Sequence, residues 1–589
     1  MSAEYDPNIK IKVEPDVEPV LPPESDSTIS ASEGAEKNLE YVYIKTELDV
    51  HPDEINVKQE APCEDPETED SLEQSQGTPC VEVKVENGEP PEYYVKTEMP
   101  TDPLIVEKLL RCCPDLKTIY LLMRQKKGLS SEQRLLQLCD SKAFNLLRKK
   151  NPDFTKKLRL VSGDITVDNL GISQEDRDEL QENCNIVFHS AACVRFDQKL
   201  KDAINMNITG TLRVLTLAEG MKNLEAFVHV STAYCRCELP QLCERLYRAA
   251  HPPRKLVELV DWMDDETLHY LEPKLIESEP NTYSYTKAVT EDLVDEFSSK
   301  FPVAIARPSI VTAAWKEPLP GWVDTMSGPS GLVIASGKGV IRTMHCKSSY
   351  TVDAVGVDIV VNGCILVAYA TALDKLKETQ VYNLTLSNMI KVTWDDVLKL
   401  GEKWVHKYPF TVALWYPGGT MKSYWICHQI SLVLTHLLPA YLIDGLLFLL
   451  RRERFMVRLQ KRISQGLETF QYYTTKQWDF KNQRFLALHQ RISEEDRKTF
   501  YFIDPNTDQD LYFKHYVLGI REFCCKEDPS TILRARRLHR IRYLIDRGVK
   551  LIFFGFLLWF FFIKREYFFS SVELLDTTLK NFAPFPIRS

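Results

Sequence analysis

The sequence predicts an α/β protein built on a doubly wound parallel sheet. Over residues 101–385, short apolar runs alternate with amphipathic segments of helical spacing, and this alternation is typical of strands joined by helical crossovers. The runs are apolar at nearly every position, as expected of strands that are covered on both faces. Each run ends in small or polar residues. Because ligands of open α/β sheets bind outside the carboxyl ends of the strands, we expect a binding site there.

Composition and charge divide the chain into an acidic arm and a mildly basic body. The 589 residues are 44% hydrophobic and 26% charged, which is typical of a globular protein with two or three domains. Residues 1–100 hold 7 lysines, no arginine and 26 acidic residues, a balance that opposes binding to nucleic acid. The 15 cysteines include no Cys-x-x-Cys pair and no zinc-ligand spacing. We therefore expect reduced, cytosol-facing thiols and no metal site.

The acidic arm is predicted to be disordered, because its apolar residues form no helical or strand period long enough to build a core. One pattern recurs in it, an aliphatic residue followed by Lys-x-Glu. The pattern resembles the acceptor motif for the small ubiquitin-like modifier SUMO. The alternative is that an acid-rich chain produces Lys-x-Glu by chance. The predicted acceptors are Lys12, Lys45, Lys58, Lys84 and Lys96.

Five strands are predicted in the body, and their ends carry the candidate ligand contacts. They comprise residues 118–123, 158–162, 185–189, 226–230 and 303–306. The first is followed by Arg124-Gln-Lys-Lys127. Basic residues at this place lie near the adenosine ribose of a bound dinucleotide, where they favour a 2′-phosphate and hence NADP. A solvated basic turn is the alternative for this segment.

The pair Tyr283 and Lys287 is the candidate for proton transfer. In a helix the two side chains lie on one face, because they are four residues apart. The tyrosine hydroxyl would donate a proton to a carbonyl oxygen that gains charge, and the lysine would lower the tyrosine pKa and bind a cofactor ribose. The motif alone arises by chance in many long chains. The strand ends on either side of it in the sequence are what favour the catalytic interpretation.

Together these segments resemble the alcohol-forming fatty acyl-CoA reductases, a membrane-associated branch of the extended short-chain dehydrogenase/reductases. The resemblance covers residues 104–525, and the stretch Pro-Gly-Trp followed by Gly-Pro-Ser-Gly makes it specific to this branch. The matching motifs are Ile119-Tyr-Leu-Leu-Met-Arg124, Gly163-Asp-Ile165, Val187-Phe-His-Ser-Ala-Ala192, Phe227-Val-His-Val-Ser-Thr-Ala-Tyr234, Pro280-Asn-Thr-Tyr-Ser-Tyr-Thr-Lys287, Arg307-Pro-Ser-Ile310, Pro320-Gly-Trp-Val-Asp324 and Ser327-Gly-Pro-Ser-Gly331.

The resemblance implies a Rossmann-like domain over residues 101–385 and a helical domain over 386–530. It implies NADPH-dependent reduction of a long-chain acyl-CoA to a fatty alcohol, with Tyr283 as proton donor and Lys287 as its partner. A further hydroxyl would come from Thr232 or Ser231; side chains alternate along a strand end, so one of them should face the substrate, and we favour Thr232. The implied cofactor contacts are Arg124, Asp164, Ile165, Ser190, Ala191, Lys287, Ser309 and Ile310.

The chain departs from the family at the start of the body. The family has a first strand and a Gly-x-x-Gly-x-x-Gly turn that binds the cofactor diphosphate at a helix N-terminus, whereas residues 93–103 contain no glycine and two prolines. The first strand is therefore predicted to be missing. Two explanations are open: an arm introduced by splicing or a gene-model error, which we favour, or a cofactor-deficient member acting as a SUMO-modified or membrane-bound regulator. A smaller departure is Gly356, where the family usually has proline.

Two C-terminal segments are predicted to meet a membrane or an acyl chain. Residues 429–450 are apolar but are interrupted by His436 and Asp444. They are interpreted either as a membrane span or, preferably, as a buried or interfacial helix bordering an acyl tunnel. Residues 551–563 carry no charge, and their density of aromatic residues suits lipid. We expect residues 531–589 to attach the protein to a membrane, of the endoplasmic reticulum or the peroxisome, with the body facing the cytosol.

Overall fold

The computed structural model describes residues 42–44, 101–125, 128–387, 389–502 and 507–581. The predicted doubly wound sheet is confirmed. Five of its strands are β2 (Ile119–Met123), β3 (Leu158–Ser162), β4 (Ile186–His189), β5 (Ala226–Val230) and β7 (Val303–Pro308). They match the five predicted strands within a few residues. A further strand, β12 (Gln380–Leu384), extends the sheet beyond β7 and was not predicted.

The first strand was predicted to be missing, and this is wrong for three residues of the acidic arm. Val42–Ile44 forms β1, which pairs in parallel with β4, so that Ile44 lies opposite His189. On its other side β1 lies next to β2, which pairs only with β3. β1 is thus the edge strand of the five-stranded sheet β1-β4-β5-β7-β12, and it lies beside the separate pair β2-β3. The five predicted SUMO acceptors lie outside the described residues.

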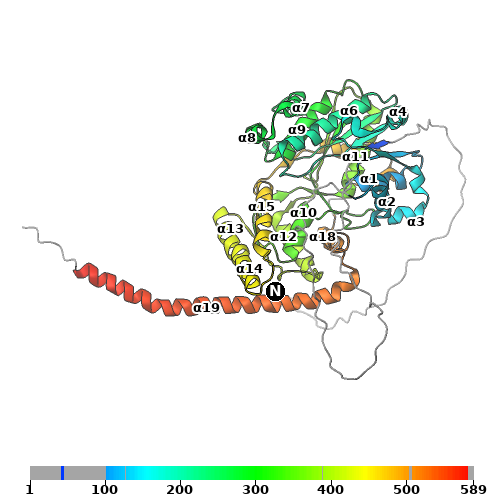
Figure 1. Ribbon diagram of the computed structural model, residues 1–589. Coiled ribbons are helices and arrows are strands. Elements are labelled where there is room, and N and C mark those ends of the chain that lie inside the picture. Colours follow the sequence, from blue (N-terminus) through cyan, green and yellow to red (C-terminus); the bar gives the residue numbers. More distant parts are fainter. Residues whose placement is uncertain (1–41, 45–100, 126–127, 388, 503–506, 582–589) are drawn as a thin grey trace, which may run out of the picture. The chain divides into compact units, whose positions relative to one another are not determined.

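Helices cover both faces of the sheet (Figure 1). Alternate strand residues point to opposite faces: Phe188 and Val228 belong to a core that includes α1 (Thr101–Cys112) and α11 (Val357–Asp374). Val187 and Phe227 belong to the opposite core, with α6 (Gly210–Glu219) and α9 (Thr282–Asp295). Burial on both faces explains why the strand sequences are apolar at nearly every position.

The remaining elements complete the α/β body and the helical C-terminal part. The further strands, all short, are β6 (Gln241–Leu242), β8 (Ile310–Thr312), β9 (Thr343–His345), β10 (Thr351–Val352), β11 (Ala354–Gly356), β13 (Val392–Thr393), β14 (Thr420–Lys422) and β15 (Asp479–Phe480). The further helices of the body are α2 (Ser131–Asp140), α3 (Asn145–Lys150), α4 (Gln174–Asn183), α5 (Leu200–Ile204), α7 (Pro253–Trp262), α8 (Asp265–Leu275) and α10 (Gly328–Gly337). The later helices are α12 (Trp394–Lys407), α13 (Trp425–Leu432), α14 (Leu438–Leu449), α15 (Met456–Thr474), α16 (Gln483–Leu488), α17 (Glu494–Thr499), α18 (Gln509–Gly519) and α19 (Ile532–Asn581).

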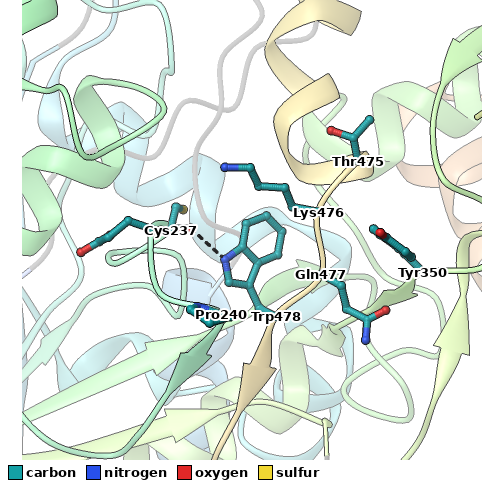
Figure 2. A pocket seen from close by; sticks show the side chains of 8 residues that line it. Cys237, Pro240, Tyr350, Thr475, Lys476, Gln477 and Trp478 are labelled. Atoms are coloured by element: carbon teal, nitrogen blue, oxygen red, sulfur yellow. Dashed lines mark hydrogen bonds between the residues drawn. The ribbon is translucent and has the colours of Figure 1, made fainter. Parts of the chain in front are cut away.

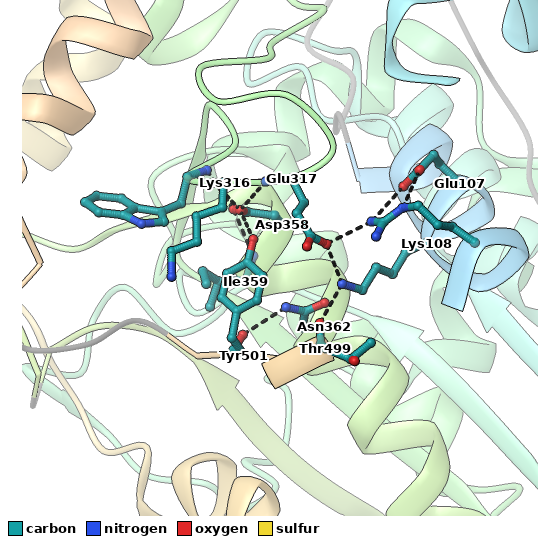
Figure 3. A network of polar contacts seen from close by, with 11 residues as sticks. Glu107, Lys108, Lys316, Glu317, Asp358, Ile359, Asn362, Thr499 and Tyr501 are labelled. Carbon is teal, nitrogen blue, oxygen red and sulfur yellow. Dashed lines mark hydrogen bonds and ion pairs between the residues drawn. The ribbon is translucent and has the colours of Figure 1, made fainter. Parts of the chain in front are cut away.

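A buried polar network joins the first helix of the body to the C-terminal part (Figure 3). The Glu317 carboxylate accepts hydrogen bonds from Lys108 (2.7 Å) and Arg111 (2.8 Å) of α1. Asp358, at the start of α11, accepts from the Tyr501 hydroxyl at 2.6 Å and from the backbone N–H of Lys316 at 2.7 Å. Because buried charges are costly without such partners, this network fixes α1, α11 and the 499–501 segment to one another.

Of two glycines singled out in the sequence, Gly321 is required by backbone geometry and Gly356 is not. Gly321 of the Pro-Gly-Trp motif has φ +80°, and a Cβ there would lie 2.1 Å from the carbonyl oxygen of His515 in α18. The motif therefore allows close contact between the sheet domain and the helical domain. Gly356, in contrast, has φ −63°, the value that proline adopts. The departure from the family at Gly356 therefore leaves the backbone course unchanged.

Candidate active site

The carboxyl ends of the parallel strands meet at one edge of the sheet, and α9 crosses that edge. The helix begins at an N-cap, where the Asn281 side chain accepts a hydrogen bond from Ser284 N–H. Asn281 also donates to the Tyr473 hydroxyl at 2.8 Å. Capping fixes the first turn of the helix, which carries Tyr283. The start of α9 is thus held by α15 of the C-terminal part.

Tyr283 and Thr232 lie together in the structure. Their side chains are hydrogen-bonded, and both are almost completely buried. Burial raises the pKa of Tyr283 above its usual value, and the Thr232 hydrogen bond offsets this only in part. Lys287, one turn later on α9, donates from its ammonium to the Val230 carbonyl at 2.7 Å. Tyr283 is therefore a neutral hydroxyl that can donate a proton.

Ser231 points away from Tyr283. Its hydroxyl donates to Glu291 of α9 at 2.6 Å, and Arg307 at the end of β7 donates to the same carboxylate at 2.8 and 2.5 Å. All three side chains are 1% exposed or less. A buried and fully paired hydroxyl of this kind is a structural group. Of the two alternative residues, Thr232 is the one that the structure places beside Tyr283.

Two neutral histidines lie beneath Lys287. His189 of β4 and His229 of β5 are fully buried, and their ring centroids are 5.5 Å apart. Burial, and then the Lys287 charge, lowers the pKa of His189 to about 3 and that of His229 well below its usual value. Both rings are therefore uncharged at neutral pH. The lysine is the positive group of this part of the site, and the strands below it add no second charge.

The predicted cofactor contacts lie at the ends of four strands along the same edge. Arg124 and Asp164, after β2 and β3, form an ion pair at 3.7 Å in which both side chains stay partly exposed. Ile165 is buried next to Gly210. The other predicted contacts follow β4 and β7, and all of these strands run parallel. They are Ser190, Ala191, Ser309 and Ile310.

Asn207 is a positioning residue that the sequence did not single out. It lies in the π-helical turn η4 (Asn205–Thr209) and bonds both the N–H (2.7 Å) and the C=O (3.2 Å) of Cys193. Its amide also donates to Thr286 of α9 at 2.8 Å. Asn207 thus ties the loop after β4 to the helix that carries Tyr283. The available signal was an asparagine at the start of an otherwise apolar helix face.

An open groove lies beside an aromatic cluster next to the site (Figure 2). Its volume is about 510 Å³, and Trp478 forms one wall, with its indole N–H donating to the Cys237 carbonyl at 3.1 Å. Rings of Tyr234 and Tyr473 contact Trp478 on the inner side. Tyr473 in turn lies against Phe196, whose ring centroid is 5.8 Å from that of Tyr283. Two aromatic layers therefore separate the groove from Tyr283.

Comparison with known proteins identifies the family. Residues 103–364 match the NAD-binding model described as Male sterility protein, and residues 435–527 match a second model with that description. Fatty acyl-CoA reductase 2 of Homo sapiens is 36% identical over 493 residues, covering 81% of this chain and 95% of that protein. Fatty acyl-CoA reductase 1 of Mus musculus is 35% identical over 467 residues, covering 79% and 90%. The chain belongs to the fatty acyl-CoA reductase family.

The NAD-binding domain of this family holds a nicotinamide cofactor. The residues at the strand ends suit two parts of it, the adenosine end and the nicotinamide end. Arg124 and Asp164, expected at the adenosine end, form an ion pair, and Lys287, Tyr283 and Thr232, expected at the nicotinamide end, lie together. The match to the NAD-binding model begins at Pro103 in α1. Between β1 and α1 the sequence has only two glycines, Gly77 and Gly88, which do not form the phosphate-binding spacing.

Glu279, just before α9, generates a prediction about stability. Burial and a hydrogen bond to Glu238 raise the pKa of Glu279 to about 9 from a usual 4.5. The folded protein therefore keeps a proton that the unfolded chain loses above pH 4.5, so this group destabilises the fold increasingly as pH rises from 4.5 to 9. Relative to the wild type, the unfolding free energy of Glu279→Gln should rise by up to about 1.4 kcal/mol for each pH unit in this range.

Chemical denaturation of the wild-type protein and the Glu279→Gln variant from pH 5 to pH 9 measures this effect. Because Gln does not ionise, the difference in unfolding free energy between the variant and the wild type should grow with pH. Gln also keeps an acceptor for Cys237 N–H. Glu238→Gln removes the partner carboxylate and should therefore reduce the pH dependence of the unfolding free energy. An advantage that is constant across pH would show that Glu279 is ionised in the folded protein.

Proposed function

We propose that this protein reduces a long-chain fatty acyl-CoA to a primary alcohol, with NADPH as the reductant. The observation that carries the proposal is the contact between Tyr283 and Thr232 beside Lys287, in a chain of the fatty acyl-CoA reductase family. Two hydroxyls that converge on one point can both hydrogen-bond a carbonyl oxygen. They stabilise the negative charge that develops there when a hydride adds to the carbonyl carbon.

The reaction needs two hydride additions, and the nicotinamide supplies a hydride in each when it is bound. In the first, the thioester carbonyl becomes a tetrahedral oxyanion held by Tyr283 and Thr232. The carbonyl re-forms as the carbon–sulfur bond breaks, and coenzyme A leaves as a thiolate. In the second, the aldehyde becomes an alkoxide, which Tyr283 protonates. Lys287 holds the cofactor ribose and provides positive charge near the tyrosine when its proton leaves.

The tyrosine hydroxyl is tested by Tyr283→Phe, which keeps the ring and removes the proton donor. We expect kcat with palmitoyl-CoA and NADPH to fall roughly 10²- to 10⁴-fold, the range for loss of a general acid, with little change in KM. The measurement is fatty alcohol formation by the purified protein.

Tyr285→Phe is the matched control, because Tyr285 lies on the same helix and its hydroxyl contacts His251 instead. Its activity should stay close to that of the wild type. If Tyr283→Phe and Tyr285→Phe are equally active, Tyr283 is not the proton donor.

The preference for NADPH over NADH is attributed to Arg124. A guanidinium in this position pairs with a 2′-phosphate, and one charged contact of this kind is worth roughly 10- to 100-fold in affinity. We expect Arg124→Ala to weaken NADPH binding by that factor and to leave NADH binding nearly unchanged, as measured by cofactor fluorescence titration. Arg159→Ala, which removes an exposed arginine of the neighbouring strand, should change neither. Equal loss for both cofactors would contradict the assignment.

The proposal includes attachment of the protein to a membrane. Residues 531–589 attach the protein to the membrane of the endoplasmic reticulum or the peroxisome, with the catalytic body on the cytosolic side. This placement suits a substrate whose alkyl chain partitions into lipid, and the cysteines of the described ranges are all free thiols. The comparisons support a reductase and do not support the regulatory alternative.

The arm lysines are proposed as acceptors of SUMO, and a reconstituted conjugation reaction tests this. We expect the wild-type chain to gain modified forms that disappear when Lys12, Lys45, Lys58, Lys84 and Lys96 are changed to Arg. Lys10→Arg/Lys37→Arg is the control, because these two arm lysines are not followed by x-Glu. Conjugation that the fivefold variant retains would place the acceptors elsewhere.

A further inference from the structure

The segment from α13 to α14 exposes an apolar face with no partner in the part of the chain that the structure describes. Residues Trp425–Leu449 form one rod, in which the π-helical turn η5 (Val433–Leu437) joins the two helices. The segment is long and apolar enough to cross a membrane, yet few of its side chains are buried. The exposed side chains include Trp425, Ile426, Ile430, Val433, Leu434, Leu438, Tyr441, Leu442, Leu446, Phe448 and Leu449.

The buried polar residues of the rod, His428, His436 and Asp444, point toward the protein. His428 and His436 contact the Thr343 hydroxyl (3.2 Å) and the Arg342 backbone N–H (2.8 Å). The Asp444 carboxylate accepts from the N–H groups of residues 455–457 at the start of α15, at 2.9 to 3.1 Å. These three residues recur every eight positions, roughly two helical turns, so they form one stripe. Most apolar side chains of residues 429–450 are exposed, so of the buried or interfacial helix expected from the sequence only the interfacial form fits.

This arrangement excludes a transmembrane orientation of the rod. A spanning helix is surrounded by lipid or by other spanning segments, whereas this one is attached along one side to β9 and α15. A helix with one apolar face and a polar side bound elsewhere lies in the plane of a membrane interface. At 1.5 Å per residue the rod is roughly 37 Å long, which gives a large area for insertion.

Charge at the end of the rod identifies the kind of surface that fits it. Residues 451–462 contain five arginines and one lysine against one glutamate. The Arg454 guanidinium lies 5.5 Å from the ring of Phe448, at the border of the apolar face. Arginines that flank an inserted apolar face bind anionic lipid headgroups. A second protein copy would bring the same basic cluster and repel it.

Arg342 contacts both the rod and α19. The backbone N–H of Arg342 bonds His436 of the rod, and its guanidinium lies 3.5 Å from Asp546 of α19. Trp415 donates to the same carboxylate at 2.7 Å. From Leu551 to Phe560, α19 carries only exposed apolar side chains and one glycine. We propose that the α13–α14 face inserts into the interface of an anionic bilayer and forms a second membrane contact beside α19.

Vesicle flotation of the full-length protein tests this contact separately from the tail and from catalysis. The tail variant Phe554→Asp/Leu558→Asp should still float with vesicles that contain phosphatidylserine, more weakly with phosphatidylcholine alone, and less as salt is raised. Adding Leu434→Asp/Leu442→Asp should lower the floated fraction roughly tenfold or more, because aspartate opposes insertion.

The control is Leu136→Asp/Leu373→Asp in the same tail variant. These leucines are equally exposed, at 64% and 55%, but lie outside the rod, so flotation should not change. Thermal unfolding should be similar for all variants, since each altered side chain is exposed. The proposal is overturned if the tail variant floats with neither vesicle, or if the rod substitutions have no effect. It is also overturned if they convert a dimer to a monomer, measured by light scattering, while flotation stays constant.

Discussion

The hydrogen bond from the Lys287 ammonium to the Val230 carbonyl sets the geometry of the whole site. It attaches α9 to the last residue of β5, so the helix cannot slide along the sheet. With Lys287 fixed there, Tyr283 lies one turn earlier and meets Thr232 at the strand end. The neutral histidines below leave the lysine charge uncompensated from that side. The relative positions of Lys287, Tyr283 and Thr232 depend on this attachment.

A second buried contact decides which strand-end hydroxyl is available. Glu291 lies one turn after Lys287 on α9 and accepts from both Ser231 and Arg307. Since a buried carboxylate is costly unless it is paired, the three groups hold one another and keep Ser231 out of the reaction. β5, α9 and β7 are thereby joined on the side away from Tyr283. The same helix thus contacts two successive residues that follow β5, Ser231 through Glu291 and Thr232 through Tyr283.

The sequence predicted what depends on periodicity and strand ends, and failed where long-range contacts decide. The five strands and the Tyr283–Lys287 spacing follow from local pattern. β1 could not be predicted, because Val42–Ile44 is three residues within an acid-rich arm and becomes a strand only by pairing with β4. Asn207 was missed for a similar reason: its partners lie 14 and 79 residues away.

The polar residues of the α13–α14 rod show why an interrupted apolar segment is ambiguous in sequence. His436 and Asp444 would disfavour insertion if they faced lipid, but each satisfies backbone N–H groups of the body. Asp444 accepts from the start of α15, and Tyr473 near the end of α15 contacts Asn281, the N-cap of α9. One helix therefore connects the apolar face to the catalytic helix. A membrane contact at the rod would hold Tyr283 at a fixed height above the lipid that supplies its substrate.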